Sequence, residues 1–149
     1  MAYTCLLYHL IIRTKSNVPA ISADHERDLY AYIWGFCKGK RCVLHRVNGM
    51  ADHLHLLVDI HPSLAIADFV RLLKISSNDW LHNHKEWFPH FNAWGKGYCA
   101  LTYSKQDAAV IKQYIVNQKE HHKKTSFQDE YRSLLLEFGI QPDEWLFHD

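Results

Sequence analysis

The chain has 149 residues, of which 48% are hydrophobic and 22% are charged. This length and composition exclude a disordered chain and indicate one globular domain that can bury a core of its own. No apolar run approaches the ~20 residues that span a bilayer, and the N-terminus lacks the basic start and small-residue cleavage site of a signal peptide. We therefore expect a cytoplasmic protein without a membrane partner.

The cysteines, Cys5, Cys37, Cys42 and Cys99, show no paired framework. A chain of this size does not need disulfide bonds to hold its fold, so we expect the reduced thiols of a cytoplasmic protein. Cys37 and Cys42 bracket the segment KGKR and could form half of a zinc site, but no second cysteine pair completes it.

The formal net charge of +1 hides an uneven distribution of charge. Residues 126–149 carry six acidic side chains and one basic one, whereas the preceding residues carry sixteen basic and ten acidic ones. A basic body joined to an acidic tail favours a polyanionic partner such as nucleic acid, although two solvated faces would produce the same counts. We accordingly divide the chain into a domain over residues 1–125 and an acidic helical extension over residues 126–149.

The first two predicted elements are a strand and a helix. Residues 3–14 are rich in aromatic and branched side chains, which favours a strand. Residues 22–36 place their apolar side chains at helical spacing, and Gly35 and Gly39 can end that helix. The pattern therefore begins β-α.

A β-hairpin and a second helix are predicted next. Residues 41–47 and 52–60 both resemble strands, and Asn48-Gly49 between them is a common hairpin turn. Ser63 can cap a following helix whose apolar side chains recur at helical spacing.

The fourth predicted strand covers residues 94–104 and leads directly into a helix. Ser104 and Asp107 resemble a capping box, which predicts a helix that continues to about residue 124. This helix carries most of the side chains that we consider as a catalytic group below.

A short helix is predicted at the end of the chain. Ser126 and Asp129 repeat the capping signature, and Gly139 can close this last helix. The complete order β-α-β-β-α-β-α is close to the ferredoxin-like split arrangement. We therefore expect an α+β fold, in which helices cover one face of an antiparallel sheet and a C-terminal helical tail is appended.

Two histidines in the third predicted strand are candidate metal ligands. Side chains alternate along a strand, so His53 and His55 point to one side, about 7 Å apart, while Leu54 and Leu56 point into the core. At that spacing both imidazoles can bind one divalent ion. The alternative is an exposed sheet face that carries polar residues.

The predicted helix after the fourth strand offers partners for this pair. Tyr114 and Gln118 share a helix face, and His121 lies one turn further along it. Two imidazoles and an amide oxygen, with open positions, suit Mg²⁺ or Mn²⁺ holding a phosphate oxygen better than a closed zinc site. A tyrosine hydroxyl near such an ion can attack a polarised electrophile. Taken singly, a core tyrosine and a solvated glutamine remain the alternatives.

Basic residues near these elements are candidates for contacts with a nucleic-acid backbone. They flank the predicted strands and the second helix, and they are Arg13, Lys15, Arg46, Arg71 and Lys74. Lys112, Lys119 and Lys123 lie on the opposite side of the tyrosine helix, and we interpret them as solvated.

Several segments resemble one known family. DHLHLLV resembles the histidine-hydrophobic-histidine (HUH) motif, and YIVNQKEHH resembles the tyrosine helix of single-tyrosine HUH transposases. These are the insertion-sequence-200-like enzymes, whose relatives include the REP-associated tyrosine transposases. FNAWGKGYCALTYS resembles the last strand of the family, and TSFQDEYRSLLLEFGI resembles the tail of one long subgroup. The resemblance covers nearly the whole chain, and the residues before 126 match the catalytic domain.

The resemblance implies a site and a reaction. His53, His55 and Gln118 would bind the divalent metal, and Tyr114 would attack a phosphodiester of single-stranded DNA at hairpin-bearing element ends. The products would be a 5′-phosphotyrosine bond and a free 3′-hydroxyl, which can later rejoin strands. The resemblance also implies a homodimer, often with the tyrosine helix of one subunit completing the histidine pair of the other.

The motif leaves some roles and some alternatives open. It assigns none to Asp52, His121 or His122, although His121 could line the site. The chain could also be a domesticated relative that nicks hairpin DNA, or a non-catalytic ferredoxin-like regulator that binds nucleic acid. Hairpin-bearing ends in the flanking DNA would distinguish a mobile element from a domesticated one.

Overall fold

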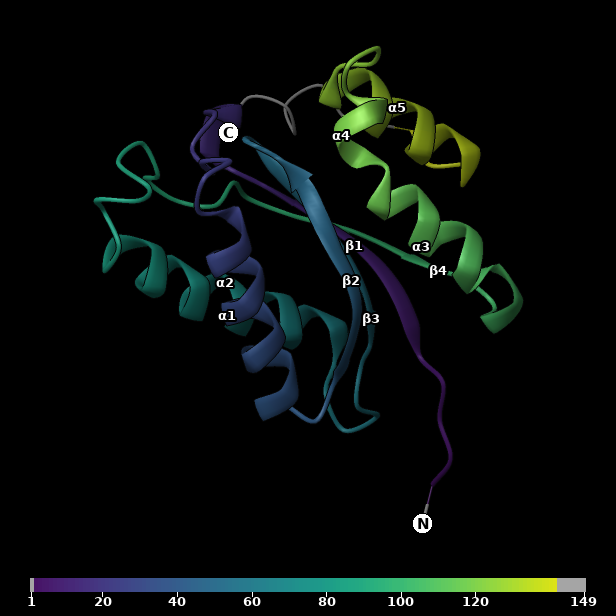
Figure 1. The fold of residues 1–149 in the computed structure, drawn as a ribbon. Coiled ribbons are helices and arrows are strands. Elements are labelled where there is room, and N and C mark those ends of the chain that lie inside the picture. Colours follow the sequence, from purple (N-terminus) through teal and green to yellow (C-terminus); the bar gives the residue numbers. More distant parts are fainter. Residues whose placement is uncertain (1, 142–149) are drawn as a thin grey trace.

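The computed structural model describes residues 2–141, and its centre is a four-stranded antiparallel sheet (Figure 1). The strands are β1 (Leu7–Arg13), β2 (Val43–Met50), β3 (His53–Asp59) and β4 (Cys99–Thr102). They lie in the order β2-β3-β1-β4, so β1 and β3 are the two central strands of the sheet. This is the ferredoxin-like order, and the α+β prediction is confirmed.

Helices cover both faces of the sheet. The helices are α1 (Glu26–Gly39), α2 (Ile66–His82), α3 (Ala108–Val116), α4 (Gln118–His121) and α5 (Phe127–Glu137), with short 3₁₀ turns at Lys15–Asn17 and Lys105–Asp107. In Figure 1, α1 and α2 lie on one side of the strands and α3, α4 and α5 on the other. The sequence predicted helices on one face of the sheet, and α1 and α2 cover that face. The helices α3, α4 and α5 form a second layer over the opposite face, to which His53 and His55 point.

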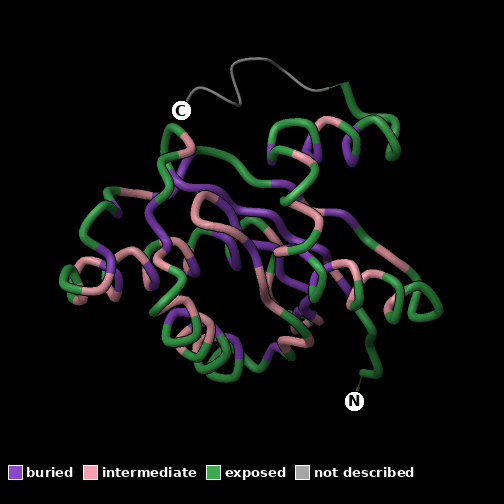
Figure 2. Tube along the Cα trace, turned by 45° about the horizontal axis from the view of Figure 1, so that its top comes forward, coloured by how far each residue is buried: buried purple, intermediate pink, exposed green. Residues whose placement is uncertain are grey.

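The main core lies between the sheet and the first helical layer. Leu54, Leu56 and Val58 of β3 are fully buried and pack with apolar residues of α1 and α2 such as Leu29 and Phe69. Burial of each such side chain contributes on the order of 1.5–3 kcal/mol. Figure 2 shows this burial as a nearly continuous purple path along the central strands β1 and β3. The core face therefore follows the predicted alternation.

A second, smaller core joins α5 to the other face of the sheet. It combines side chains of β1 and β4 with one side of α5, namely Ile11, Cys99, Leu101, Phe127, Tyr131, Leu134 and Leu135. The described part of the C-terminal extension therefore packs on the sheet. The remaining part of the predicted acidic tail, from residue 142 onward, lies outside the described residues.

The hairpin turn lies three residues after the predicted one. Asn48 and Gly49 belong to β2, where they pair with residues of β3, and the chain reverses at Ala51 and Asp52. A Cβ atom on Gly49 would lie 2.1 Å from the carbonyl oxygen of His53. Gly49 is therefore needed for the close approach of β2 and β3. The prediction of a hairpin turn at Asn48-Gly49 is wrong.

Some helix ends also differ from the prediction. Ser63 does not cap α2, which begins after Ala65 without a side-chain cap. Gly35 lies inside α1, which ends at Gly39. Gly139 follows α5 with a φ of 72°, a left-handed conformation that suits glycine at a helix end.

The region after β4 is less regular than a single helix. The Ser104 hydroxyl donates to Asp107 Oδ2 over 2.9 Å. Ser104 precedes a 3₁₀ turn that leads into α3. Asn117 separates α3 from α4, so the predicted helix to residue 124 is interrupted. The Ser126 cap is confirmed, because its side chain accepts from the backbone amide of Asp129.

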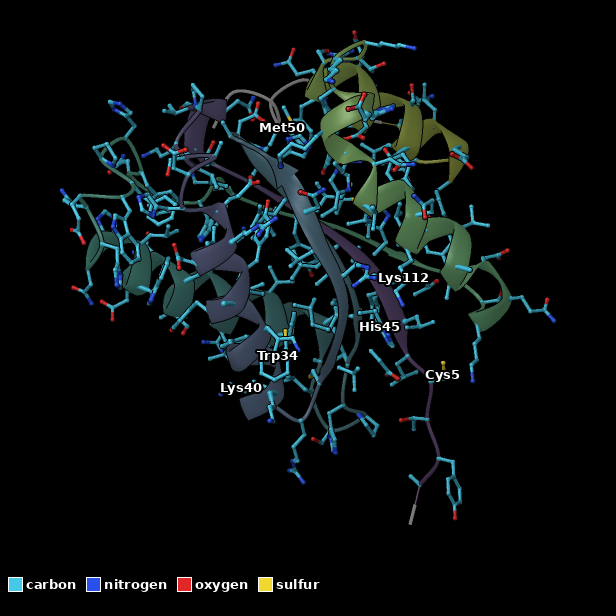
Figure 3. All side chains as sticks on the ribbon, viewed as in Figure 1. Cys5, Trp34, Lys40, His45, Met50 and Lys112 are labelled. Carbon is cyan, nitrogen blue, oxygen red and sulfur yellow. The ribbon has the colours of Figure 1, made fainter. Side chains whose placement is uncertain are left out.

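The remaining predictions concern the cysteines, a zinc half-site and membrane-spanning helices. All four cysteines are free; Cys5 is exposed on the segment before β1 (Figure 3), and Cys37, Cys42 and Cys99 are buried. Cys37 and Cys42 belong to no group of potential metal ligands among the described residues. Within residues 2–141, none of the helices combines the length and apolar character that crossing a membrane would require.

Candidate metal centre and tyrosine

The histidine pair lies on the sheet face that α3, α4 and α5 cover. His53 and His55 follow the alternation of β3, and both side chains are completely buried. Phe127 at the start of α5 stacks on His53 with ring centroids 4.0 Å apart. The pair is therefore enclosed by the second helical layer, and the alternative of an exposed polar sheet face is wrong.

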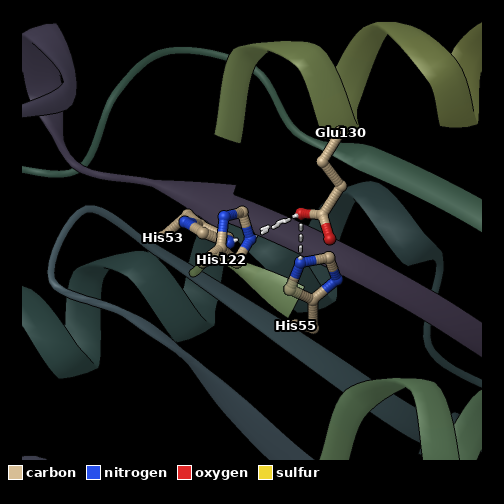
Figure 4. A group of neighbouring side chains, drawn as sticks. All are labelled: His53, His55, His122 and Glu130. Atoms are coloured by element: carbon tan, nitrogen blue, oxygen red, sulfur yellow. Dashed lines mark hydrogen bonds and ion pairs between the residues drawn. The ribbon is translucent and has the colours of Figure 1, made fainter. Parts of the chain in front are cut away.

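Three imidazoles at this position are held by their Nδ1 atoms. Each Nδ1 has a hydrogen-bond partner outside the site: Asp52 Oδ1 at 2.8 Å for His53, His9 Nε2 at 2.7 Å for His55, and the Thr125 carbonyl oxygen at 2.7 Å for His122. Such bonds fix the orientation of a ring and leave Nε2 for the site. The three Nε2 atoms then point toward one carboxylate, as Figure 4 shows.

That carboxylate belongs to Glu130 on the first turn of α5. The residue is only 3% exposed. Its Oε1 lies 3.0 Å from Nε2 of His55, 3.2 Å from Nε2 of His122 and 3.5 Å from Nε2 of His53. The ligand atoms of these four residues all lie within 4.8 Å of one another. Three imidazoles and a carboxylate therefore form a group that could hold a metal ion.

The tyrosine and the glutamine meet the same carboxylate. Oε2 of Glu130 accepts hydrogen bonds from the Tyr114 hydroxyl and, over 3.0 Å, from Nε2 of Gln118. The amide oxygen of Gln118 faces the imidazoles, 3.1 Å from His122 Nε2 and 3.4 Å from His53 Nε2. The break at Asn117 thus leaves both side chains directed at the histidine pair.

Burial and hydrogen bonding set the charges of the site. Burial lowers the pKa of His55 to about 4, so this imidazole is neutral at physiological pH, as a metal ligand must be. Burial alone would raise the pKa of Glu130, but hydrogen bonds with His122, His53 and His55 outweigh it and lower that pKa. The carboxylate is therefore ionised.

Burial and then the hydrogen bond to Glu130 raise the pKa of the Tyr114 hydroxyl. The hydroxyl is consequently protonated and acts as the donor to the carboxylate. Tyr114 also lines an open pocket of about 390 Å³ together with His121 and Lys124. A phosphate group could approach the hydroxyl from this side.

Sequence reasoning identified part of this arrangement. The structure brings His53, His55, Tyr114 and Gln118 together. His121 also lines the site, with Nε2 3.2 Å from Oε2 of Glu130 but without hydrogen-bond alignment.

Four participants have no assigned role in the sequence analysis: His9, Asp52, His122 and Glu130. Asp52 directly precedes His53, and this position next to a candidate ligand could have indicated its role in orienting the ring. Glu130 lies 75 residues from His55 and has no such signal.

Two of the residues predicted to contact DNA, Arg13 and Lys74, contact a loop of the protein. Arg13 is buried, and its Nη2 lies 3.5 Å from the Lys96 carbonyl oxygen. Lys74 donates to the carbonyl oxygens of Gly95 and Gly97 over 2.9 and 2.6 Å. Both side chains therefore contact the backbone of residues 95–97, ahead of β4.

The other basic candidates are more accessible. Lys15, Arg46 and Arg71 are exposed. Lys119, by contrast, lies with Nζ 3.0 Å from a carboxylate oxygen of Glu26. Its side chain is still 39% exposed, so Lys119 is partly solvated and also ties α4 to the start of α1.

Comparisons with known proteins give a consistent result. A family model described as "Transposase IS200 like" matches residues 2–118. The transposase for insertion sequence element IS200 of Salmonella typhimurium is 27% identical over 120 residues, which is 78% of each chain. The ISDra2 transposase TnpA of Deinococcus radiodurans is 39% identical over 75 residues, covering 48% of this chain and 54% of its own.

Solved structures show the same fold. A crystal structure from Deinococcus radiodurans R1, described as that of a transposase, has a TM-score of 0.61 and 31% identity, covering 78% of this chain and 93% of its own. A REP-associated tyrosine transposase bound to a REP hairpin also reaches 0.61, covering 82% of this chain and 72% of its own. At 10% identity, that second likeness shows the fold alone. The family match ends at residue 118, before His122 and Glu130.

Proposed function

This chain belongs to the IS200-like transposase family, and on that premise we propose that it cleaves and rejoins single-stranded DNA through Tyr114. One observation carries the proposal: the Tyr114 hydroxyl and the His53–His55 pair are directed at the same carboxylate, in one chain. A nucleophile beside side chains that can bind a metal ion suits metal-assisted phosphoryl transfer.

In the cleavage step, the Tyr114 oxygen bonds to phosphorus while the bond from phosphorus to the 3′ oxygen breaks. Oε2 of Glu130 orients the hydroxyl through their hydrogen bond, and the hydroxyl proton passes to water, because the lowered pKa of Glu130 makes its carboxylate a weak base. The 3′ oxygen takes a proton from water and leaves as a hydroxyl. The product is a 5′-phosphotyrosine bond, and attack on it by a 3′-hydroxyl restores a phosphodiester and releases Tyr114. Because the bond energy stays in the covalent link, no ATP is consumed.

His53 and His55 would hold a divalent ion, Mg²⁺ or Mn²⁺, and the family resemblance adds Gln118 as the third ligand. Their fit to an ion rests on the fixed Nδ1 atoms of the imidazoles, which leave Nε2 atoms facing the site. The bound ion would neutralise charge on the scissile phosphate, which is where such catalysis gains most. The protein's own residues orient the phosphate and the tyrosine around it.

We propose hairpin-bearing single strands at element ends as substrates. The family resemblance supports this, as does a structural neighbour that is described as bound to a REP hairpin. Lys15, Arg46 and Arg71 are exposed and suited to backbone contacts, whereas Arg13 and Lys74 would act on DNA through the loop that they hold. The resemblance predicts a homodimer with shared sites, whereas the hydrogen bond between Tyr114 and Glu130 of the same chain supports a site within one subunit.

The test is the covalent adduct. Full-length protein is mixed with single strands carrying the hairpins found beside its gene, labelled at the 3′ end so that a 5′-phosphotyrosine product keeps the label. We expect a labelled protein band on a denaturing gel with Mn²⁺ or Mg²⁺ and none with a chelator.

Tyr114→Phe should abolish the band and leave hairpin binding unchanged, because the ring keeps its packing and loses only the hydroxyl. Tyr103→Phe is the matched control, since Tyr103 is also half-buried near His9, with ring centroids 6.1 Å apart, and should still form the adduct. A persistent adduct in Tyr114→Phe would sink the assignment of the nucleophile.

A further inference from the structure

Two buried side chains of the site have no role in the family resemblance. We infer that His122 and Glu130 are metal ligands, so that the ion is bound by the imidazoles of His53, His55 and His122 and by Oε1 of Glu130. Gln118, the third ligand that the family resemblance implies, also orients Glu130 through a hydrogen bond from its amide nitrogen. This inference rests on the proposed function for the presence of an ion, and it assigns the ligand set.

The hydrogen bond at Nδ1 directs His122 at the carboxylate. A carbonyl oxygen only accepts, so the 2.7 Å contact with the Thr125 carbonyl places a proton on Nδ1 of His122. Nε2 is then the ring nitrogen that faces the site, 3.1 Å from Oε1 of Gln118 and 3.2 Å from Oε1 of Glu130. A cation enclosed by these atoms would be bound by the imidazole and the carboxylate together.

The same pattern recurs at His53. Its Nδ1 lies 2.8 Å from the Asp52 carboxylate, which holds a proton on Nδ1 and turns Nε2 toward the site. That Nε2 lies 3.5 Å from Oε1 of Glu130 and 3.4 Å from Oε1 of Gln118. Two imidazoles from separate elements therefore direct their Nε2 atoms at one carboxylate oxygen.

Glu130 is placed for the role by its two oxygens. Oε1 faces the three imidazoles, whereas Oε2 holds the Tyr114 hydroxyl and the Gln118 amide. A buried carboxylate at 3% exposure is costly unless a cation or several donors compensate it. With Oε1 on the ion, Oε2 would still hold Tyr114 beside the phosphate.

The amide nitrogen of Gln118 donates to Glu130, which fixes the carboxylate and gives Gln118 a structural reason for complete burial. The C-terminal extension also has the packing to hold a ligand. Phe127 stacks on His53, and Tyr131, Leu134 and Leu135 pack against the sheet. The position of Glu130 on α5 is therefore set by a core and not by the ion alone.

The donor set also bears on the metal. Three imidazole nitrogens and one carboxylate oxygen suit Mn²⁺ and later first-row ions, whereas Mg²⁺ prefers oxygen ligands and retained waters. We therefore expect Mn²⁺ to bind more tightly than Mg²⁺.

The experiment measures Mn²⁺ binding directly on the full chain, without DNA. Free Mn²⁺ gives a six-line electron paramagnetic resonance signal that is lost on binding, and calorimetry gives the affinity independently. We expect Glu130→Gln and His122→Gln each to lower Mn²⁺ affinity at least about tenfold. Gln118→Ala should change it less than either.

Two matched controls replace exposed side chains. Glu137→Gln changes an exposed carboxylate of the same helix, and His90→Gln changes an exposed imidazole outside the site. Both should leave Mn²⁺ affinity within about twofold of the wild type. Circular dichroism checks that each variant folds. Glu130→Asp keeps the charge but shortens the side chain, and a folded Asp variant with weakened binding separates ligand geometry from stability.

Two results would overturn the inference. If Glu130→Gln keeps or raises Mn²⁺ affinity and increases adduct formation, the carboxylate blocks the site and is not a ligand. If Gln118→Ala causes the largest loss, the ligand set implied by the family holds. Failure of the proposed function looks different: Mn²⁺ binding still depends on Glu130, but no Tyr114 adduct forms. A metal-dependent adduct unaffected by Glu130→Gln rejects the ligand assignment and any need for Glu130 in cleavage, but it leaves Tyr114 as the nucleophile.

Discussion

His9 of β1 and His55 of β3 share a hydrogen bond of 2.7 Å between Nε2 and Nδ1, with ring centroids 5.0 Å apart. Both rings are fully buried, and the other nitrogen of His9 has no hydrogen-bond partner among residues 2–141. Burial, followed by repulsion from a protonated His55, lowers the pKa of His9 to about 3, so His9 is neutral at physiological pH. The contact therefore holds the ring of His55 with its Nε2 toward Glu130, and His9 is a positioning residue.

Replacing His9 should weaken metal binding without unfolding the protein. His9→Phe keeps an aromatic ring in the core but removes the partner of His55 Nδ1, and we expect Mn²⁺ affinity to fall about tenfold. His9→Gln can still reach Nδ1 and should recover part of the loss. Calorimetry with Mn²⁺ and a thermal melt of the metal-free protein check this.

His45→Phe is the control, because His45 lies on β2 away from the site (Figure 3). Unchanged Mn²⁺ affinity in a folded His9→Phe variant would remove the positioning role.

Two glycine substitutions should act in opposite directions. Gly49→Ala puts a Cβ atom 2.1 Å from the His53 carbonyl oxygen, so β2 and β3 must move apart. We expect a loss of at least about 2 kcal/mol in the free energy of unfolding. Gly35→Ala meets nothing within 4 Å in α1 and should stabilise by up to about 1 kcal/mol. Urea denaturation measures both, and equal effects would contradict the close approach at Gly49.

The placement of the tyrosine can be tested by mixing variants. Tyr114 and His55 of the same chain have ring centroids 5.8 Å apart, which supports a site within one subunit. Inactive His55→Ala and inactive Tyr114→Phe should then remain inactive when mixed, because each chain carries its own defect. Exchange of subunits, if the chain dimerises, is checked first with differently tagged chains. Restored adduct formation in the mixture would instead establish sites shared between subunits.

Thiol reactivity should separate one cysteine from the rest. Burial raises the pKa of Cys37 to about 12, with the charge of Cys42 as a second cause, and burial raises that of Cys99 to about 11. Because the thiolate is the nucleophile, a raised pKa keeps these groups protonated and unreactive at pH 8. Cys5 is exposed and should be alkylated first by iodoacetamide.

Peptide mapping by mass spectrometry gives the order of modification, and in denaturant all four cysteines should react. Alkylation of Cys37 at the rate of Cys5 in the native protein would show that the core opens readily.

The features that the sequence predicts well are those set by a few neighbouring residues. His53 and His55 point to one face because side chains alternate along any strand. Ser126 caps α5 because its side chain reaches an amide three residues later. Tyr114 and Gln118 share a direction because they lie one helical turn apart, even though Asn117 interrupts the helix.

Where two segments meet, local signals were insufficient. Asn48-Gly49 has the composition of a turn, but pairing with β3 placed it inside a strand, because the register of the sheet outweighs a two-residue preference. The sequence predicts a solvated side chain for Lys119, but the structure pairs it with Glu26 at the start of α1.

Glu130 is the clearest case of a role that only the tertiary structure decides. In the sequence it is one acidic residue among several in an acidic tail, and nothing near it indicates a site. Apolar packing of α5 against β1 and β4 carries it to His55, 75 residues away, and encloses it there. The sequence by itself predicted the histidine pair and the order of strands and helices, since these follow from local periodicity, and the family resemblance added the role of Tyr114. The grouping of His122 and Glu130 with the histidine pair came from the tertiary structure, because contacts between distant segments depend on how whole faces pack and not on the residues beside each side chain.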